Sequence, residues 1–272
     1  MQKVETIAVL GLWHLGIVVS LGLAELGFHV VAYDNDVRRI ARLKRGISPI
    51  FEPGLEEYLL KNLKRKRITF TSSIKDIKKI DIVFVTFDTP LNDKDEPKVS
   101  LLIVLAKNVA KVLQDNVTLV ISSQVPIGTT EKIQEIISKN NKNLNFDIAY
   151  VPENLRLGNS FERFFNPSMI VVGAKRKETF DTISKLFDKI SAPKIWTTVK
   201  TAEFVKHALN CYLATSISYA NEMGNLADRV GADFYQASKI LRLDERISLH
   251  ARVSPGLPFG GWSLLRDVKV LQ

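Results

Sequence analysis

A glycine-rich turn followed by a carboxylate is the part of this sequence best suited to chemistry. An apolar run at 7–10 leads directly into Gly11-Leu12-Trp13-His14-Leu15-Gly16, and a second apolar run ends at Asp34, 23 positions after Gly11. A glycine permits a sharp turn, the amides at a helix N-terminus attract a pyrophosphate, and a carboxylate accepts hydrogen bonds from ribose hydroxyls. We therefore expect a strand-turn-helix-strand unit that binds NAD rather than NADP. Its expected cofactor-binding residues are Gly11, Trp13, His14, Leu15, Gly16 and Asp34.

One position departs from the usual dinucleotide pattern. That pattern is Gly-x-Gly-x-x-Gly, and its middle glycine lets the backbone approach the phosphates closely. Here the middle position is Trp13. The alternative is a buried unit of the same shape that binds nothing, because doubly wound folds carry many functions.

Composition indicates a folded protein with more than one part. The 272 residues are 46% hydrophobic and 25% charged, so we expect two domains, or one domain with an appendage. The apolar stretch at 17–33 is interrupted by Glu25 and His29, which argues against an export signal or a membrane span and favours a cytoplasmic location. The single cysteine, Cys211, allows no internal disulfide and no cysteine metal site, and the four histidines lack ligand spacing.

The net charge of +9 raises the possibility of nucleic-acid binding. The densest basic run, at 61–67, closes an expected amphipathic helix, where cations suit the carboxyl end of the helix dipole. The run has no interleaved aromatic residues on which bases could stack. We therefore expect a solvated surface and no nucleic-acid partner, with a positive field that attracts phosphorylated ligands.

Short apolar runs alternate with helical stretches up to about residue 175. The expected further strands are 83–86, 117–122, 146–151 and 170–173, and the expected helices include 101–113, 131–138 and 177–190. This alternation predicts an α/β fold, a Rossmann-type doubly wound and mostly parallel sheet covered on both faces. Ligands bind at the carboxyl ends of such strands, and three polar segments follow strands there. They are Thr89-Pro90, the segment from Ser123 to Pro126, and Pro152-Glu153.

The pattern changes after Pro193. Residues 201–230 contain no proline and only one glycine, Gly224, which predicts one long helix or two abutting helices. Glu203, Lys206, Asn210 and Cys211 lie near one stripe of this helix. Its apolar residues, which include Tyr212, Leu213, Ile217 and Tyr219, would suit packing against a second copy of the chain.

Eight short blocks add a family resemblance. They are Phe51-Glu52-Pro53-Gly54-Leu55, Thr89-Pro90, the segment Val125-Pro126-Ile127-Gly128-Thr129-Thr130, Pro152-Glu153 with Leu155 and Gly158, Asn166-Pro167, Ala202-Glu203-x-x-Lys206-x-x-x-Asn210 with Asn221-Glu222, Asp244-x-Arg246-Ile247, and Pro255-Gly256-x-x-Phe259-Gly260-Gly261 ending at Asp267. In this order, they resemble the nucleotide-sugar dehydrogenases of the UDP-glucose and GDP-mannose dehydrogenase type.

The resemblance implies an activity. Such enzymes oxidise the primary alcohol of a UDP-sugar to a carboxylate in two NAD-dependent steps, through a cysteine thioester. It further implies that Lys206 stabilises the developing oxyanion, that Asn210 donates to the same oxygen, and that Asp267 relays a proton through water.

Further roles also follow only from the resemblance. Glu153 would act as acid or base in thioester hydrolysis, and Thr89, Gln124 and Glu153 would contact NAD. Arg246, Phe259 and Gly260 would contact the sugar nucleotide, with Arg246 reaching it across a homodimer.

Ser263 stands where the family has its nucleophilic cysteine. A serine hydroxyl is far less ionised than a thiol near neutral pH, so we expect the second oxidation to be impaired. Cys211 neighbours Asn210 but points to a different helical angle, so we do not expect it to replace the missing thiol. Gln124 also stands where the family has a threonine, and Val151 where it has an asparagine.

The chain also stops just past the expected active-site loop, whereas the family carries a further C-terminal domain that binds the nucleotide sugar. We expect an NAD-binding Rossmann-type domain at 1–196 and a central helical dimerisation segment with the active-site loop at 197–272. A separately encoded partner chain, a truncated product or a new role as a non-catalytic NAD-binding subunit stay open as explanations. A dehydrogenase of the 3-hydroxyacid type is disfavoured, because the Glu-Pro-Gly and Phe-Gly-Gly blocks belong elsewhere.

Overall fold

The computed structural model describes residues 6–90, 92, 97–153, 155–259 and 262–271, and of residues 262 and 263 it describes the backbone alone. The chain forms two compact units. The first runs from the start of the described chain to Pro90 and from Lys98 to Phe204. The second comprises the described residues between Pro90 and Lys98 and those from Val205 onward.

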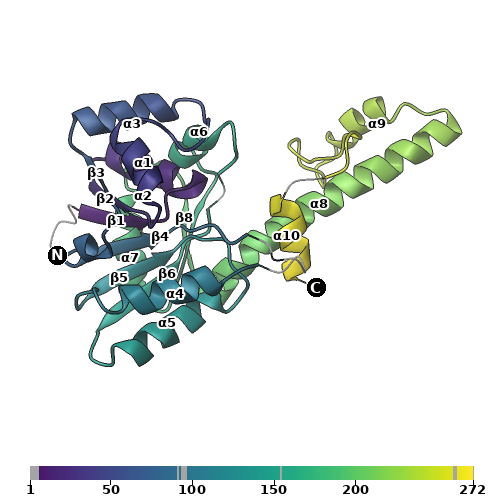
Figure 1. Cartoon of the computed structure of the whole chain (residues 1–272). Coiled ribbons are helices and arrows are strands. Elements are labelled where there is room, and N and C mark those ends of the chain that lie inside the picture. Colours follow the sequence, from purple (N-terminus) through teal and green to yellow (C-terminus); the bar gives the residue numbers. More distant parts are fainter. Residues whose placement is uncertain (1–5, 91, 93–96, 154, 260–261, 272) are drawn as a thin grey trace. The chain divides into compact units, whose positions relative to one another are not determined.

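An eight-stranded sheet forms the centre of the first unit (Figure 1). Its strands, in spatial order, are β3 (Ile68–Thr71), β2 (His29–Tyr33), β1 (Thr6–Leu10), β4 (Ile82–Val85), β5 (Val117–Ile121), β6 (Phe146–Tyr150), β7 (Ile170–Ala174) and β8 (Lys194–Thr197). Every neighbouring pair is parallel except β6 and β7. Strands β2 and β3 lie on one side of β1, and β4 and the later strands lie on its other side. Ligands of such sheets bind where the strand order reverses in this way, here between β1 and β4.

Helices cover both faces of this sheet, with α1, α3 and α6 on one face and α4 and α5 on the other (Figure 1). The bounds in the first unit are α1 (His14–Leu26), α2 (Val37–Lys44), α3 (Leu55–Lys64), η1 (Ile74–Ile77), α4 (Ser100–Val109), α5 (Thr129–Asn140), α6 (Ser160–Phe165) and α7 (Lys177–Leu186). Alternation along β1 separates two apolar layers. Ile7 and Val9 belong to the layer under α1, whereas Ala8 and Leu10 belong to the layer under α4 and α5.

The second unit is helical. It contains most of α8 (Val199–Val230), together with α9 (Phe234–Leu241) and α10 (Trp262–Val270). The segment after α9 packs on α8 at Gly224, where an added Cβ would lie 2.9 Å from Pro255. The amide of Gly256 also donates to the Asn221 side chain at 2.8 Å.

The mostly parallel α/β sheet is confirmed, and the stretch 201–230 belongs to one continuous helix. The expected strands shift by one residue at most, whereas the helices expected at 101–113 and 177–190 end earlier, at Val109 and Leu186. The edge strands β3 and β8 were missed because polar or charged residues interrupt their short apolar segments, whereas β4, which is equally short, is an unbroken apolar run. The helix α10 was missed because it follows a segment rich in glycine and proline.

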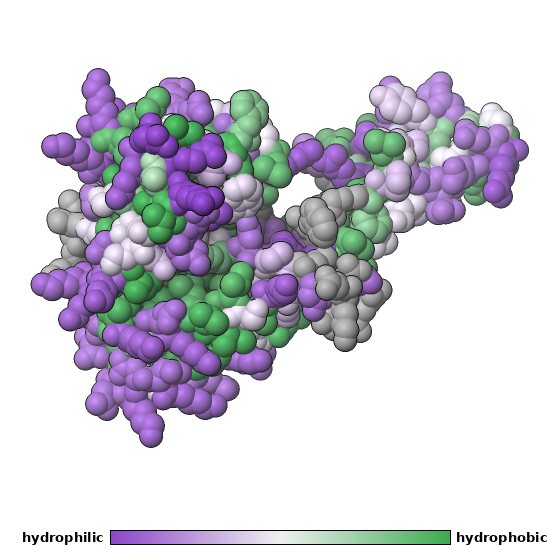
Figure 2. All heavy atoms as spheres, viewed as in Figure 1, coloured by the Kyte–Doolittle hydropathy of each residue, from purple (hydrophilic) through white to green (hydrophobic). Residues whose placement is uncertain are grey.

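The basic run lies at the end of α3 and beyond it, and hydrophilic side chains cover that part of the surface (Figure 2). Lys64, Arg65 and Lys66 are exposed. Among the described residues, no helix combines the length and the apolar character that crossing a membrane requires.

A buried carboxylate attaches the beginning of α8 to α5. The Glu203 side chain is fully buried and accepts from the amides of Gly128 at 2.6 Å and Thr130 at 2.9 Å, and from the Thr130 hydroxyl at 2.7 Å. Gly128 is the N-cap of α5 and brings no capping side chain of its own. Glu203 therefore supplies both the cap and the negative charge that the helix dipole favours.

We expect Glu203→Gln to lower the free energy of unfolding by about 1–3 kcal/mol, because an amide nitrogen would face the donors that the carboxylate now accepts from. Urea unfolding followed by circular dichroism measures this loss. Glu135→Gln is the matched control, since Glu135 is exposed on α5, the helix that Glu203 caps, and makes an ion pair across a turn to Lys139. Equal stability of the two variants would contradict the capping role.

Candidate active site and cofactor pocket

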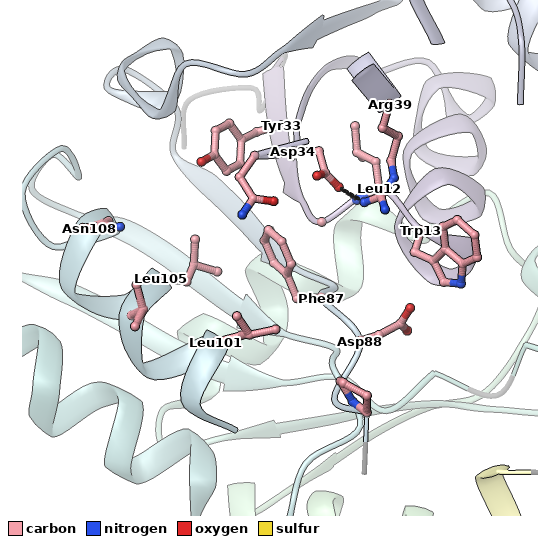
Figure 3. A pocket seen from close by; sticks show the side chains of 14 residues that line it. Leu12, Trp13, Tyr33, Asp34, Arg39, Phe87, Asp88, Leu101, Leu105 and Asn108 are labelled. Carbon is pink, nitrogen blue, oxygen red and sulfur yellow. Dashed lines mark hydrogen bonds and ion pairs between the residues drawn. The ribbon is translucent and has the colours of Figure 1, made fainter. Parts of the chain in front are cut away.

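A pocket of about 530 Å³ opens at the carboxyl ends of β1, β2 and β4 (Figure 3). One wall is polar and is formed by the glycine turn with Asp34, Asn35 and Arg39. The other wall is apolar and is formed by Phe87, Leu101, Val104 and Leu105. Leu101 and Val104 of α4 are more than half exposed, and hydrophobic residues gather over this helix (Figure 2). The pocket can therefore accept a ligand with one apolar part and one hydroxylated or charged part.

The glycine turn has the geometry that a dinucleotide requires at two of its three positions. Gly11 has a φ of +97°, and a Cβ there would lie 2.7 Å from the Phe87 ring. A Cβ on Gly16 would lie 1.6 Å from the Gly11 carbonyl oxygen, so only glycine lets α1 pass this close to the turn. The Thr86 hydroxyl donates to the carbonyl oxygens of Leu10 and Gly11 at 3.0 and 2.8 Å and fixes the turn from below.

Asp34 lies at the end of β2 and is fully buried. Its carboxylate accepts from the Leu12 amide at 2.7 Å, the Asp36 amide at 2.9 Å and the Arg39 guanidinium at 2.7 Å. The expected ribose-binding acid is therefore at the predicted place beside the turn. Arg39, five residues after Asp34, was not predicted as part of this site.

The side chains of His14 and Leu15, in the first turn of α1, contact other parts of the protein. The His14 Nε2 atom lies 2.8 Å from the Ser160 hydroxyl and 3.3 Å from the Glu52 carboxylate. Leu15 packs against the apolar layer under α1. Any contact of these two residues with a cofactor would therefore use the backbone amides at the amino end of the helix.

Glu52 is a buried junction between three distant segments. Besides His14, its carboxylate accepts from the Gly158 amide at 3.0 Å and the Ser160 amide at 2.9 Å. Burial alone would raise the pKa of Glu52, but the hydrogen bonds from Ser160 and Gly158 and the nearby His14 hold that pKa below the ordinary value of a glutamate. The Glu-Pro-Gly block thus positions the loop after β6 against α1.

The other expected cofactor residues lie in loops that follow β4, β5 and β6. The Thr89 hydroxyl donates to the Gln124 carbonyl oxygen and joins the first two of these loops. Glu153 is half-buried in the third loop. These placements agree with contact at the carboxyl edge of the sheet, and the contacts with a cofactor stay predictions.

A second cluster of expected site residues lies within the helical unit. Asp267 of α10 is fully buried, and its two oxygens meet His207 Nδ1 at 2.8 Å and the Asn210 amide, which donates to it. His207 is also fully buried. The structure thus brings together two of the expected catalytic residues, Asn210 and Asp267, and adds His207. The i, i+3 spacing of His207 and Asn210 was the signal that could have found it.

The remaining expected residues of this unit are Lys206, Phe259, Arg246, Gly260 and Ser263, and the structure describes only some of them. Lys206 is half-buried on α8, one residue before His207, and Phe259 is half-buried in the loop before α10. Arg246 is exposed and makes a two-point ion pair with Asp244, with one contact at 2.7 Å. Gly260 and the side chain of Ser263 lie outside the described part of the structure.

The thiol of Cys211 is a poor nucleophile. Burial, and secondarily the charge of Asp267, raises the pKa of its thiol. A raised pKa leaves less thiolate at neutral pH, and the thiolate is the reactive form. Among the described residues no group of histidine, cysteine and acidic side chains could hold a metal ion.

Comparisons with known proteins identify the family. Residues 5–191 match the NAD binding domain of the UDP-glucose/GDP-mannose dehydrogenase family, and residues 200–272 match its central domain. The chain belongs to this family. UDP-glucose 6-dehydrogenase YwqF of Bacillus subtilis is 34% identical over 97% of the chain, which spans 60% of that protein.

Solved structures agree in fold. A UDP-glucose dehydrogenase from the archaeon Pyrobaculum islandicum superposes with a TM-score of 0.93 at 34% identity, over 99% of this chain and 63% of its own. A 3-hydroxyisobutyrate dehydrogenase of Mycobacterium tuberculosis covers 99% of this chain and 86% of its own, with a TM-score of 0.70 at 14% identity, which shows a shared fold alone. The chain thus spans about 60% of the length of the UDP-glucose dehydrogenases that it matches.

The residues of the pocket fit NAD, the cofactor of the matched domain, in most respects. Gly11 and Gly16 form a turn that an added Cβ would fill, Asp34 lies beside it, and α4 supplies an apolar wall. These residues of the dehydrogenase domain would hold the adenosine half of the cofactor and its pyrophosphate. Trp13 is the misfit, since it brings a large side chain to the middle position of the turn.

The depressed pKa of Glu52 generates a pH-dependent prediction. The ionised form stabilises the fold fully above the ordinary glutamate pKa of about 4.3, and that contribution is lost as the pH falls through the lower pKa of the folded state. We expect Glu52→Gln to reduce the free energy of unfolding by about 1–2 kcal/mol near pH 7.

The difference in the free energy of unfolding between Glu52→Gln and the unchanged protein should become smaller as the pH falls below about 4. Guanidinium unfolding across this pH range measures it. Glu57→Gln, an exposed change on α3, is the control and should show a small difference at every pH. A difference in the free energy of unfolding that grows at low pH would refute stabilisation of the fold by the ionised form of Glu52.

Proposed function

We propose that this protein oxidises the primary alcohol of a UDP-sugar with NAD and is impaired in the second of the two oxidations typical of its relatives. The observation that carries the proposal is the buried cluster of Asn210, Asp267 and His207, which lies in a chain matched along both dehydrogenase domains. NAD, when bound, supplies the hydride acceptor, and the chain's own residues supply orientation and proton transfer.

In the first step, the alcohol loses a hydride from carbon and a proton from oxygen, which gives an aldehyde. Asp267 receives that proton through a water molecule, and Lys206 and Asn210 stabilise the negative charge that develops on the substrate oxygen. The hydrogen bond from Asn210 and the contact with His207 orient the carboxylate of Asp267. His207 acts here as a positioning residue.

The second step is where Ser263 matters. In the relatives' chemistry a thiol adds to the aldehyde, loss of a second hydride gives a thioester, and water hydrolyses it to the acid and the free thiol. A serine hydroxyl would follow the same steps, adding to the aldehyde to form a hemiacetal that loses a hydride to give an ester. However, the hydroxyl is far less ionised than a thiol. The aldehyde should therefore accumulate relative to the acid.

Two further features concern partners. The exposed apolar residues of α8, which include Leu209, Tyr212, Tyr219 and Leu226, suit a homodimer formed through residues 201–230. A separate chain could also supply residues that grip the nucleotide sugar, because this chain spans about 60% of its relatives. The alternative function is a non-catalytic NAD-binding subunit, which the serine at position 263 favours.

The direct test gives the purified chain NAD with UDP-glucose or UDP-N-acetylmannosamine and follows reduced nicotinamide by absorbance and the sugar products by mass spectrometry. We expect reduced nicotinamide together with more aldehyde than acid. Binding of NAD without turnover of either sugar would overturn the enzyme proposal and leave the subunit proposal in place. Co-purification of a second chain that restores turnover would identify the partner.

We expect Ser263→Cys to raise the proportion of carboxylate product about tenfold or more, because a thiol captures the aldehyde better than a hydroxyl. Quantifying acid and aldehyde at equal turnover measures the change. Ser248→Cys, which places a thiol at an exposed position in the same unit, is the matched control. An unchanged product ratio in Ser263→Cys would contradict a nucleophile position at residue 263.

We expect Asp267→Asn to lower the rate of nicotinamide reduction by about 10²-fold or more, because the amide cannot accept the proton. Asp228→Asn, an exposed change on α8, should leave the rate near that of the unchanged protein. Thermal melting followed by circular dichroism separates loss of chemistry from loss of fold. A folded Asp267→Asn variant with an unchanged rate would exclude the proton-relay role.

A further inference from the structure

A buried histidine contacts the acid that would accept the substrate proton. His207 of α8 and Asp267 of α10 are each 0% exposed, and the His207 Nδ1 atom lies 2.8 Å from one carboxylate oxygen of Asp267. The Asn210 amide donates to the other oxygen, so the two contacts attach α10 to α8 (Figure 1). Asn210 and Asp267 are defining positions of family blocks, whereas His207 stands at an unspecified position of the central-helix block.

The contact determines which ring nitrogen of His207 can gain a proton. An ionised carboxylate accepts hydrogen bonds and donates none, so the hydrogen between the two groups belongs to Nδ1. Nε2 is then the site at which the imidazole gains its second proton. The neutral ring orients the Asp267 carboxylate and leaves it basic. The protonated ring is a cation in contact with the carboxylate, and such a cation lowers the basicity of its partner.

The neighbouring charged and titratable side chains ordinarily keep one charge state near neutral pH. Close to the pair along the two helices they are Glu203, Lys206 and Cys211 on α8, and Arg266 and Lys269 on α10. The Glu203 carboxylate accepts from amides at the start of α5, and burial raises the pKa of the Cys211 thiol. Lysine and arginine side chains ordinarily stay charged between about pH 5 and about pH 8. The imidazole is thus the group of this set that ordinarily changes charge in that range.

We propose that His207 makes proton acceptance by Asp267 depend on pH in the range of an imidazole, because the neutral ring leaves the carboxylate basic and the protonated ring does not. The proposal rests on the proposed function, whose first oxidation supplies the proton. In that step the alcohol loses a hydride from carbon to the nicotinamide cofactor and its O–H proton, through water, to the Asp267 carboxylate. His207 acts through Asp267 and is a positioning residue. A side chain that only oriented the carboxylate would give no such dependence on pH.

The test is the pH dependence of nicotinamide reduction by the full chain with NAD and saturating UDP-glucose or UDP-N-acetylmannosamine. For the unchanged protein we expect a rate at about pH 5 that is about tenfold below the rate at about pH 8, because a neighbouring cation lowers the basicity of a carboxylate by about 10²-fold. His207→Asn places an amide nitrogen near the position of Nδ1, so it can still donate to Asp267 but cannot gain a proton. Its rate should change less than about twofold over the same range.

Cys211→Ala is the matched control, because it removes a titratable group one turn from His207 and should keep the pH dependence of the unchanged protein. Thermal melting followed by circular dichroism shows whether each variant is folded. Equal pH dependence in the unchanged protein and a folded His207→Asn variant would overturn this proposal alone, and so would a rate of the unchanged protein that does not fall at low pH. Absence of turnover at every pH would overturn the proposed function and this proposal together.

A second measurement requires no turnover. The proton NMR signal of the His207 Cε1–H group, assigned by its loss in His207→Asn or His207→Gln, should move between about pH 5 and about pH 8. In Asp267→Asn this movement should occur at lower pH, because the carboxylate that favours the imidazolium is gone. A signal that does not move in this range, or that moves identically in Asp267→Asn, would overturn the proposal.

Discussion

Buried carboxylates that accept from backbone amides are the constraint on which the loops of the first unit depend. Asp34, Glu52 and Glu203 each bind amides of segments that follow other strands, and each is nearly or fully buried. An ionised carboxylate is costly to bury unless it is hydrogen-bonded, so each one requires its amide partners to stay in place. The loops at the carboxyl edge are therefore fixed by electrostatics as much as by apolar packing.

This constraint gives several of the family blocks a physical meaning. Glu52 of the Glu-Pro-Gly block meets Gly158 and Ser160, which belong to or directly follow the block that begins at Pro152. Glu203 of the central-helix block meets the Gly128-Thr129-Thr130 block at the start of α5. In both cases, one block supplies the carboxylate and a block far away in the sequence supplies the amides that donate to it. Their shared order with the relatives reflects the scaffold of the site as well as its chemistry.

The sequence predicted the sheet class, the glycine turn and the acid at the end of β2, because strand alternation and turn chemistry are local properties. It did not predict the partners of those residues. Helical spacing places His207 beside Asn210, but its pairing with Asp267 is a contact between distant segments that this spacing does not encode. The contact of Arg39 with Asp34 likewise depends on how the side chain packs over the end of β2. The edge strands β3 and β8 were missed because polar residues interrupt their short apolar segments, unlike the equally short but wholly apolar β4.

The replacement at the middle of the glycine turn shows how a scaffold can persist while a site changes. Gly11 and Gly16 are required by close contacts within the protein itself, with Phe87 and with the turn's own carbonyl oxygen. The middle position has no such internal requirement, since Trp13 adopts an ordinary extended conformation there. Only a ligand would require glycine at that position. A side chain can therefore occupy this position without loss of the fold.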